Sequence, residues 1–586
     1  MTTPRVAKAP TPVQLLRKLQ DAKVQFGSDA GALMLKLLDA AARVQFRSAS
    51  TLIHFHELLL FIRVYPQNAE VMKKADALLA NFSARVAALR GKGSELFDEE
   101  GAAGIAGTAI DGTFTYDVVR WLVQTHPGEV DIDWDGYENW DRLGATLPRF
   151  VPLLEEDSLV EANVPYLDWL QAFKENGGNQ LSWLLRCFED LSCSPREKAE
   201  LFASLELQVR WELKDSRASR THMRRPSQNI YFHSGPLLRR KDILLEIEMN
   251  AEPLPIEKLS APEAQRIIDM TRDASVVRYR ELYGFTHGDS RCVLRADAGR
   301  GLEIFVFGVP PERRLPLRAY HAGFFCKNGV PIGYVETLTF FERIEIGFNL
   351  YYTFRDGESA WLYAQMLRLF RQLLGINCVS VDPYQIGFHN QEAVDSGAFW
   401  FYRKLGFRPV QPELAHLTLA EEKKIAKHSG YRTSERTLRR LAGGPMVYES
   451  PGSKTGEWDR FLMRHLGWQL QRRMAEAFVG DPQRMRHEAI ASVAVALDVP
   501  IPRQGTPEHT CFENFALALS LISDLSDWSP GNKQQVVDAI RAKSAANDGL
   551  PEVKYLRNLQ AAHRLREAWI RIGSNRPAVR EAKVPK

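Results

Sequence analysis

The stretch from Ile344 to Val381 reads IEIGFNLYYTFRDGESAWLYAQMLRLFRQLLGINCVSV. Its first part alternates in the period of a β-strand, and one face would carry Ile344, Ile346, Phe348, Leu350 and Tyr352. A glycine turn at 355–359 precedes a run with helical spacing, formed by Trp361, Leu362, Gln365, Met366, Leu369 and Phe370. Gly375 stands where a helix would end, and Cys378–Val381 is a short apolar strand. The order strand, turn, helix, strand predicts a sheet with helices packed on it.

Further strands are expected upstream of this stretch. Residues 318–326 and 330–340 are apolar runs joined by Asn328-Gly329, a strong signal for a two-residue hairpin. With 344–353 they would form an antiparallel meander. Residues 302–307 would add another strand, 243–249 would be the first strand, and 261–283 would be a helical pair that covers the sheet.

Downstream, residues 398–407 read AFWFYRKLGF and predict a second helix, closed by Gly406. Together with the preceding order of elements, this segment resembles the GNAT acyltransferase superfamily, whose last core helix has the form A-x-x-x-Y-x-K-x-G-F. Every fixed position of that pattern is met. The resemblance covers about residues 240–415 and implies an α+β fold: a mixed central sheet with helices on both faces, flanked here by helical regions at both ends.

The resemblance also implies a co-substrate, acetyl-CoA or another acyl-CoA. The turn at Gly357 opens a helix, where unpaired backbone N–H groups and the positive helix end favour phosphate. The expected cofactor-binding residues are Arg355, Gly357, Glu358, Ser359, Ala360 and Asn390. Asp356 and Glu358 place two negative charges beside the expected pyrophosphate, and like charges repel at short range. On this basis Glu358→Ala is expected to tighten acyl-CoA binding.

Acyl transfer from a thioester to an amine needs an acid for the leaving thiolate and a base for the amine. By resemblance, Tyr402 on the last core helix would be the acid. Glu336 and Glu345 on neighbouring strands are the candidate bases, and His321 is a weaker one. The alternative interpretation of Tyr402 is structural, because it belongs to a run of aromatic residues at 399–402 that would suit a buried core.

Composition is that of a globular protein, with 45% apolar and 25% charged residues among 586. The net charge of +4 is too small to indicate nucleic-acid binding by itself. Six scattered cysteines show no zinc spacing and suggest reduced thiols in the cytoplasm. No apolar run reaches the ~18–20 residues of a membrane span. The N-terminal residues lack the apolar segment of a signal peptide.

Four regions are expected: helices at 1–90, a mostly helical region at 91–240 with glycine-rich and basic linkers, the acyltransferase-like domain at 241–415, and a helical domain at 416–586. The basic stretch 217–241 could contact phosphate of RNA or of a cofactor, or be a solvated linker. We expect no metal. His54 and His56 are two residues apart and do not share a helix face, and the acidic loop from Asp131 has Arg142 where a calcium loop needs a glutamate.

Three hypotheses follow. The first is an acyl-CoA-dependent N-acyltransferase, acting on an amine of a small molecule or a protein. The second is a non-catalytic scaffold or binding protein on a GNAT-like fold. The third is a transferase that uses aminoacyl-tRNA and binds RNA through 217–241.

Overall fold

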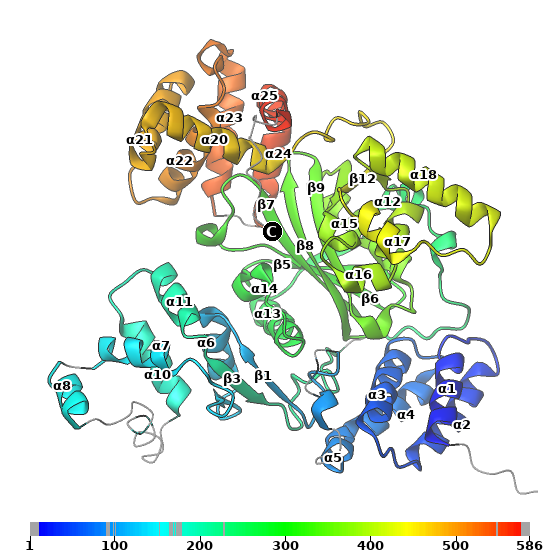
Figure 1. Ribbon diagram of the computed structural model, residues 1–586. Helices are drawn as coiled ribbons and strands as arrows, with labels where there is room; N and C mark the ends of the chain where they lie inside the picture. The colour runs from blue at the N-terminus through cyan, green and yellow to red at the C-terminus, as the bar shows by residue number, and fades with distance from the viewer. Residues whose placement is uncertain are drawn as a thin grey trace, which may run out of the picture. The chain divides into compact units, whose positions relative to one another are not determined.

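The structure is a computed structural model that describes residues 11–89, 94–97, 99, 101–151, 153–162, 168, 170, 179–226, 229–546 and 549–575. The chain divides into two compact units (Figure 1). Unit 1 contains residues 1–237, 266–286 and 327–331, and unit 2 contains 238–265, 287–326 and 332–586.

Unit 1 begins with the helices expected over 11–90. They are α1 Pro12–Ala22, α2 Ala30–Ala42, α3 Ala49–Val64, α4 Ala69–Ala80 and α5 Phe82–Ala87, followed by η1 Ser94–Phe97. The next region has more helices, which are α6 Tyr116–Thr125, α7 Trp140–Thr146, η2 Leu147–Arg149, α8 Leu153–Ala162, α10 Gln180–Asp190 and α11 Pro195–Ser204. It also holds an antiparallel sheet of order β1-β3-β2, with β1 Ala109–Thr113, β2 Val130–Ile132 and β3 Gln208–Glu212.

A nine-stranded mixed sheet has the order β11-β12-β10-β9-β8-β7-β6-β5-β4. Its strands are β4 Ile256–Lys258, β5 Val293–Gly299, β6 Leu302–Phe307, β7 Ala319–Lys327, β8 Val330–Phe340, β9 Arg343–Leu350, β10 Cys378–Val381, β11 Arg408–Pro409 and β12 Met446–Glu449. Strands β9 and β10 are parallel, whereas the pairs β4–β5, β5–β6, β8–β9, β10–β12 and β11–β12 are antiparallel. The predicted α+β class with a mixed sheet is confirmed.

The helices between the strands are η3 Arg240–Asp242, α12 Leu245–Met249, α13 Ala261–Val276, α14 Tyr283–His287, η4 Pro311–Arg313, η5 Tyr352–Phe354, α15 Ser359–Leu374, η6 Pro383–Ile386, α16 Gln391–Asp395, α17 Ala398–Lys404, α18 Pro412–Lys427 and α19 Glu435–Leu441. A C-terminal group of packed helices follows (Figure 1), with α20 Met463–Phe478, α21 Pro482–Leu497, α22 Pro507–Leu519, η7 Leu525–Asp527, α23 Pro530–Ser544, α24 Val553–Ala561 and α25 His563–Ser574.

Helix α15 is the centre of unit 2. It connects the parallel strands β9 and β10, and eleven of its sixteen residues are buried. It ends at Gly375, which has a φ of 66° and so adopts the left-handed conformation that glycine tolerates. Its polar side chains hold other segments: Gln365 donates to Glu248 at 2.6 Å, and Gln372 bonds both backbone groups of Leu254. A helix that is buried on most of its surface belongs to the core.

Most of the elements predicted around this helix are confirmed, and the strands predicted at 318–326, 330–340 and 344–353 are neighbours in the sheet. The strands at 302–307 and 378–381, the Asn328-Gly329 hairpin turn and the helix from Ala398 agree with the sequence. The strand predicted at 243–249 is wrong, because Leu245–Met249 is helix α12, which packs on α15. The prediction that 416–586 is entirely helical is also wrong. Strand β12 enters the sheet between β10 and β11, and this position depends on pairing with strands far away in the chain. Tyr352 lies in η5, beyond the end of β9.

Among the described helices, none is both long enough and apolar enough to cross a membrane.

A buried ion pair joins the C-terminal helices to strand β7. Lys543 of α23 pairs with Glu552, and both side chains are almost wholly buried. Lys543 also donates to the carbonyl of Arg318 at 2.8 Å, and Glu552 accepts from the backbone N–H of Tyr320 at 3.1 Å. Burial lowers the pKa of Lys543, while Glu552 opposes that shift. The charged pair is therefore held by several bonds to the start of β7.

Removing one partner of this pair should be costly, because it leaves the other charge buried and unpaired. We expect Lys543→Met to lower the free energy of unfolding by about 3–5 kcal/mol. Arg472→Met is the matched control, because its pair with Glu476 is exposed, and it should change stability by less than about 1 kcal/mol. Urea unfolding of both variants beside the parent protein measures the difference. Equal losses would show that the buried pair contributes no more than a surface pair.

Candidate functional site

Strand β9 has an open edge where strand β10 stops. The parallel register pairs only Arg343, Ile344 and Glu345 with β10, which ends at Val381, whereas β9 continues to Leu350. The backbone N–H of Tyr351 donates to Ile332, so the odd-numbered residues of β9 direct their N–H and C=O groups toward β8. The even-numbered residues direct theirs to the other side. Phe348 therefore presents its backbone groups to the side that β10 no longer occupies.

The two candidate bases lie on one face of the sheet. Glu336 of β8 is opposite Gly347 of β9, and Leu338 is opposite Glu345. Opposed residues of an antiparallel pair, and residues two apart in one strand, share a face. A Cβ built on Gly347 would meet nothing closer than the Gln385 amide at 3.7 Å. The structure thus brings both carboxyl groups to the border of a bare patch of backbone.

The two carboxyl groups have different neighbours. The hydroxyl of Tyr320 donates a hydrogen bond to Glu336. Glu345 lines a small cavity of about 50 Å³ together with Arg318 and Arg343. Burial lowers the pKa of Arg318, and the charge of Glu345 opposes that shift. Glu336 therefore has a hydroxyl neighbour, whereas Glu345 lies between two cations.

Tyr402 lies in an aromatic cluster on the opposite face. The ring centroids of Phe348 and Tyr363 are 5.2 Å apart, those of Tyr363 and Tyr402 are 5.6 Å apart, and those of Tyr402 and Phe407 are 5.4 Å apart. Phe348 and Glu345 are three residues apart in β9, so their side chains leave opposite faces. Helix α17 carries Tyr402, which therefore lies on the far side of the sheet from both candidate bases.

Burial raises the pKa of the Tyr402 phenol above its ordinary value of 10.0, so Tyr402 stays protonated at neutral pH and is a weaker acid than a free phenol. It has the packing of a core residue and still carries a proton that it could donate.

Glu358 at the start of α15 is fully buried and paired. Its carboxylate forms an ion pair with Arg300 and accepts the backbone N–H of Leu238 at 3.1 Å. The Arg300 guanidinium lies 5.8 Å from the centroid of the Trp361 ring. The charge of Glu358 is thus compensated inside the protein. The expectation that Glu358→Ala tightens acyl-CoA binding no longer follows, because that change would leave the buried end of Arg300 without its carboxylate.

The other predicted cofactor-binding residues have structural partners. Arg355 donates to the carbonyl of Leu350 at 3.0 Å and to Glu392 at 2.6 Å. The Gly357 N–H donates to Phe354, and the Ser359 hydroxyl donates to the Arg355 carbonyl at 2.9 Å. Ala360 is buried in the first turn of α15. Residues 355–360 therefore lie together, but the side chains of Arg355 and Ser359 already form hydrogen bonds that stabilise the turn before α15.

Asn390 lies at the start of a different helix. Its side-chain oxygen accepts from the N–H of Ala393 at 3.1 Å, which caps α16, and its amide donates to the Tyr384 carbonyl at 3.1 Å. Asn390 therefore organises the segment between η6 and α17.

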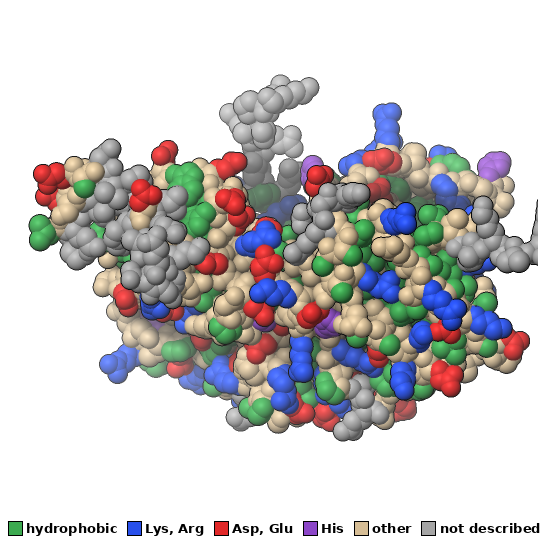
Figure 2. Space-filling model, turned by 90° about the horizontal axis from the view of Figure 1, so that it is seen from below, with side chains coloured by type: hydrophobic (Ala, Val, Ile, Leu, Met, Phe, Trp, Pro, Cys, Tyr) green, Lys and Arg blue, Asp and Glu red, His purple; other side chains and the backbone are tan. Residues whose placement is uncertain are grey.

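The basic stretch 217–241 is divided between the units, with 217–237 in unit 1 and 238–241 in unit 2. Arg220 pairs with Glu57 at 2.5 Å, and Arg224 pairs with Asp76 at 2.9 Å. On the face drawn in Figure 2, Lys and Arg side chains are interspersed with Asp and Glu. Two arginines of the stretch therefore serve internal contacts of unit 1.

A buried histidine in unit 1 joins three segments of the chain. His56 Nδ1 lies 2.9 Å from Glu57, and Nε2 lies 2.9 Å from the hydroxyl of Thr221, which accepts the N–H of Ala106 at 2.9 Å. Hydroxyl, imidazole and carboxylate are ordered as in a proton relay, but His56 and Thr221 are fully buried. The arrangement therefore connects helix α3 to residues 106 and 221 inside unit 1.

Metal ligands do not gather in the described part of the chain. There, no group of three or more His, Cys, Asp or Glu side chains is placed to hold an ion. The loop that begins at Asp131 instead packs its aromatic residues, with the rings of Trp134 and Trp140 stacked at 5.3 Å.

Sequence reasoning missed two residues of this site. Arg300 stands between two glycines in the β5–β6 turn, and this Gly-Arg-Gly signal predicts a tight turn but not its partner. Tyr320 carries no local signal at all, because its contact with Glu336 arises only when β7 and β8 pair.

Comparison with known proteins gives no match. The chain matches no protein-family model, and it has no significant match among curated proteins or solved structures.

The buried Arg300–Glu358 pair gives a stability prediction. Arg300→Met should lower the free energy of unfolding by about 3–5 kcal/mol, because it leaves the buried carboxylate of Glu358 unpaired. The double variant Arg300→Met/Glu358→Met should recover part of that loss, since no charge is then buried. The exposed pair of Arg196 and Glu200 supplies the control, Arg196→Met. Urea unfolding of the parent and the three variants measures these changes, and a double variant no more stable than Arg300→Met would contradict the pairing.

His56 gives a pH prediction. Burial lowers its pKa below the ordinary value of 6.5, so the unfolded chain binds the proton first as pH falls. The contribution of neutral His56 is therefore fully present above about pH 6.5 and is lost as the pH falls below that value. We expect His56→Gln to flatten the dependence of unfolding free energy on pH between about pH 7.5 and 5.5. His563→Gln, at an exposed position, should keep the parent slope, and an unchanged slope in His56→Gln would refute the prediction.

Proposed function

We propose that this chain is an acyl-CoA-dependent N-acyltransferase with a GNAT-like arrangement of helices on both faces of its sheet. The observation that carries the proposal is the parallel pair β9–β10, which is joined by α15 and whose pairing ends after three residues while β9 continues. The resulting opening exposes a strand edge inside a sheet, beside the start of a buried helix.

The opening suits the chemistry of coenzyme A. An exposed strand edge binds an extended chain through alternating N–H and C=O groups. The pantetheine arm of coenzyme A carries two amides, and the backbone edge at Phe348 offers the complementary groups. The start of α15 and Arg355 would then lie near the phosphates of the ligand. Arg355 would leave its ion pair with Glu392 and bind a phosphate instead. We assign no contact to Glu358, whose carboxylate is already satisfied.

The reaction follows from the positions of the candidate acid and bases. The acceptor amine attacks the thioester carbonyl carbon, a new C–N bond forms, and the C–S bond breaks. Glu336 accepts the proton that the amine loses, and Tyr402 donates a proton to the leaving thiolate. Because these groups lie on opposite faces of the sheet, the opening beyond β10 is where one bound thioester contacts both. Glu345 beside two arginines is the weaker base.

One observation favours the second function, a non-catalytic scaffold on this fold. Arg300, Glu358 and the N–H of Leu238 already close the start of α15. If that network also excludes phosphate, the opening binds no acyl-CoA, and the helical regions carry the interactions with partners. The use of aminoacyl-tRNA has less support, since Arg220 and Arg224 are engaged inside unit 1.

Calorimetric titration with acetyl-CoA, longer acyl-CoAs and free CoA tests the proposal directly. We expect dissociation constants near 1 µM, which corresponds to about −8 kcal/mol. Tyr402→Phe should leave this affinity within about twofold and lower the rate of acyl transfer by about 100-fold or more, because only the proton donor is lost. Tyr352→Phe, at an exposed tyrosine, should change neither.

The contrary results are distinct. An absence of binding at millimolar acyl-CoA would support the scaffold. Equal rates for the parent and Tyr402→Phe, with binding retained, would remove the assignment of Tyr402 and leave the acyl-CoA site in place. Binding of tRNA that weakens steeply with salt would support the third hypothesis.

A further inference from the structure

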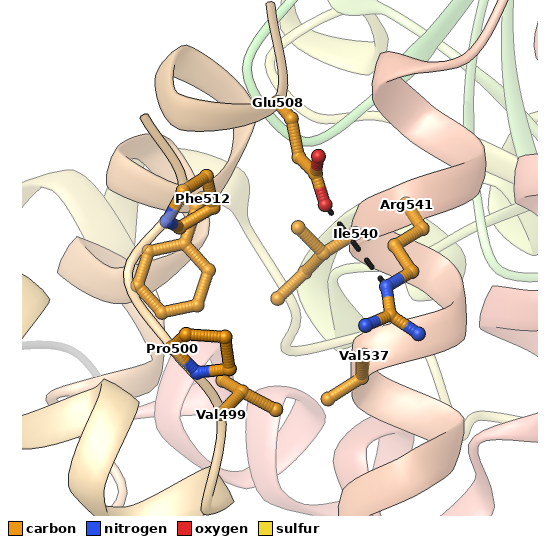
Figure 3. Close-up of a pocket in the computed structure, with 8 residues that line it drawn as sticks. Val499, Pro500, Glu508, Phe512, Val537, Ile540 and Arg541 are labelled. Carbon is orange, nitrogen blue, oxygen red and sulfur yellow. Dashed lines mark ion pairs between the residues drawn. The ribbon is translucent and has the colours of Figure 1, made fainter. Parts of the chain in front are cut away.

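The C-terminal helices enclose a second site, far along the chain from the residues discussed above. A cavity of about 170 Å³ lies between α22, α23 and the segment that follows α21 (Figure 3). Its apolar walls are Val499, Pro500, Pro502, Phe512, Val537 and Ile540. Phe512, Val537 and Ile540 are buried and belong to the core of the helical group. The proline nitrogens add no N–H donors to the wall.

Two charged side chains stand at this cavity. Glu508 comes from the first turn of α22 and Arg541 from the last turn of α23. Their side chains approach one another in Figure 3, with 4.0 Å between Arg541 Nε and the carboxylate. This distance is too long for a hydrogen bond, so the pair is held by charge alone. Each side chain is half exposed and keeps hydrogen-bonding capacity for a third group.

We infer that this cavity binds a free hydrophobic α-amino acid. The guanidinium of Arg541 would bind the α-carboxylate, and the carboxylate of Glu508 would bind the α-ammonium group. The ligand side chain would fill the apolar cavity. An apolar cavity of about 150 Å³ holds a benzene ring, so the volume suits the side chain of phenylalanine or leucine. A zwitterion satisfies both charges at once, which neither an anion nor a cation does.

The proposal concerns residues of α22, α23 and 499–502 only, and it does not depend on acyl transfer. It also gives a role to an anion and a cation that flank one apolar cavity and are half exposed. A purely apolar ligand would leave the pair unused, and a monocarboxylate would face the negative charge of Glu508 at short range.

Calorimetric titration of the full chain with L-phenylalanine and L-leucine tests the inference. We expect saturable binding with a dissociation constant of about 1 mM or tighter for a ligand of this size. L-alanine lacks the side chain, 3-phenylpropionate lacks the ammonium group, and 2-phenylethylamine lacks the carboxylate. Each should bind about tenfold more weakly than L-phenylalanine, or not at all.

Variants separate the charged groups from the cavity. Arg541→Gln and Glu508→Gln should each weaken binding of L-phenylalanine by about tenfold or more. Val499→Trp should fill the cavity from its border and abolish binding while both charges remain. Arg472→Gln, from an exposed pair on α20, should bind as the parent does. Urea unfolding confirms that each variant is folded.

Several results would overturn the inference. One is an absence of binding when either amino acid is present at a concentration about tenfold above the expected dissociation constant. The others are equal affinities for 3-phenylpropionate and L-phenylalanine, and an unchanged affinity for L-phenylalanine in both charge variants. Binding that survives Val499→Trp would place the ligand elsewhere.

Discussion

The crossover of α15 between two parallel strands is the constraint on which the rest of unit 2 depends. Parallel strands cannot be joined by a hairpin, so a helix must span the sheet and be buried against it. Once buried, α15 provides a surface on which other segments of the chain are fixed. Side chains of α15 bond Glu248 and Leu254, and Gln560 of α24 donates to the carbonyl at its C-terminal end.

Buried charge is used repeatedly to fix segments to this core. Arg300 and Glu358 hold the β5–β6 turn to the start of α15, and Lys543 and Glu552 hold the C-terminal helices to β7. Such pairs add little net stability compared with apolar residues of the same size, but breaking one is costly. They therefore determine where segments attach. At the start of α15 the Glu358 carboxylate bonds Arg300 and the N–H of Leu238 and makes no hydrogen bond to the first N–H groups of the helix.

The two proposed sites differ in how they are built. The opening beyond β10 is a gap in a sheet, flanked by acid and base candidates on opposite faces. The cavity of the C-terminal helices is an apolar space between packed helices, with one anion and one cation beside it. In the opening beyond β10 a ligand would be bound mainly by backbone groups, and in the cavity of the C-terminal helices it would be bound mainly by side chains. A ligand of the first must present amides in an extended chain, and a ligand of the second must present two opposite charges next to an apolar group.

The sequence by itself determined the local elements of this protein. Alternation gave β9, helical spacing gave α15, Asn328-Gly329 gave a hairpin turn, and Gly375 gave a helix end, because each depends on neighbouring residues only. Glu336 and Glu345 could be named as candidates on neighbouring strands for the same reason. Only the tertiary structure decided that Leu245–Met249 is a helix, that β12 joins the sheet between β10 and β11, and that Glu358 is paired with Arg300. These outcomes depend on contacts between residues far apart in the chain, and no local pattern encodes the partner of a buried charge or of a four-residue strand.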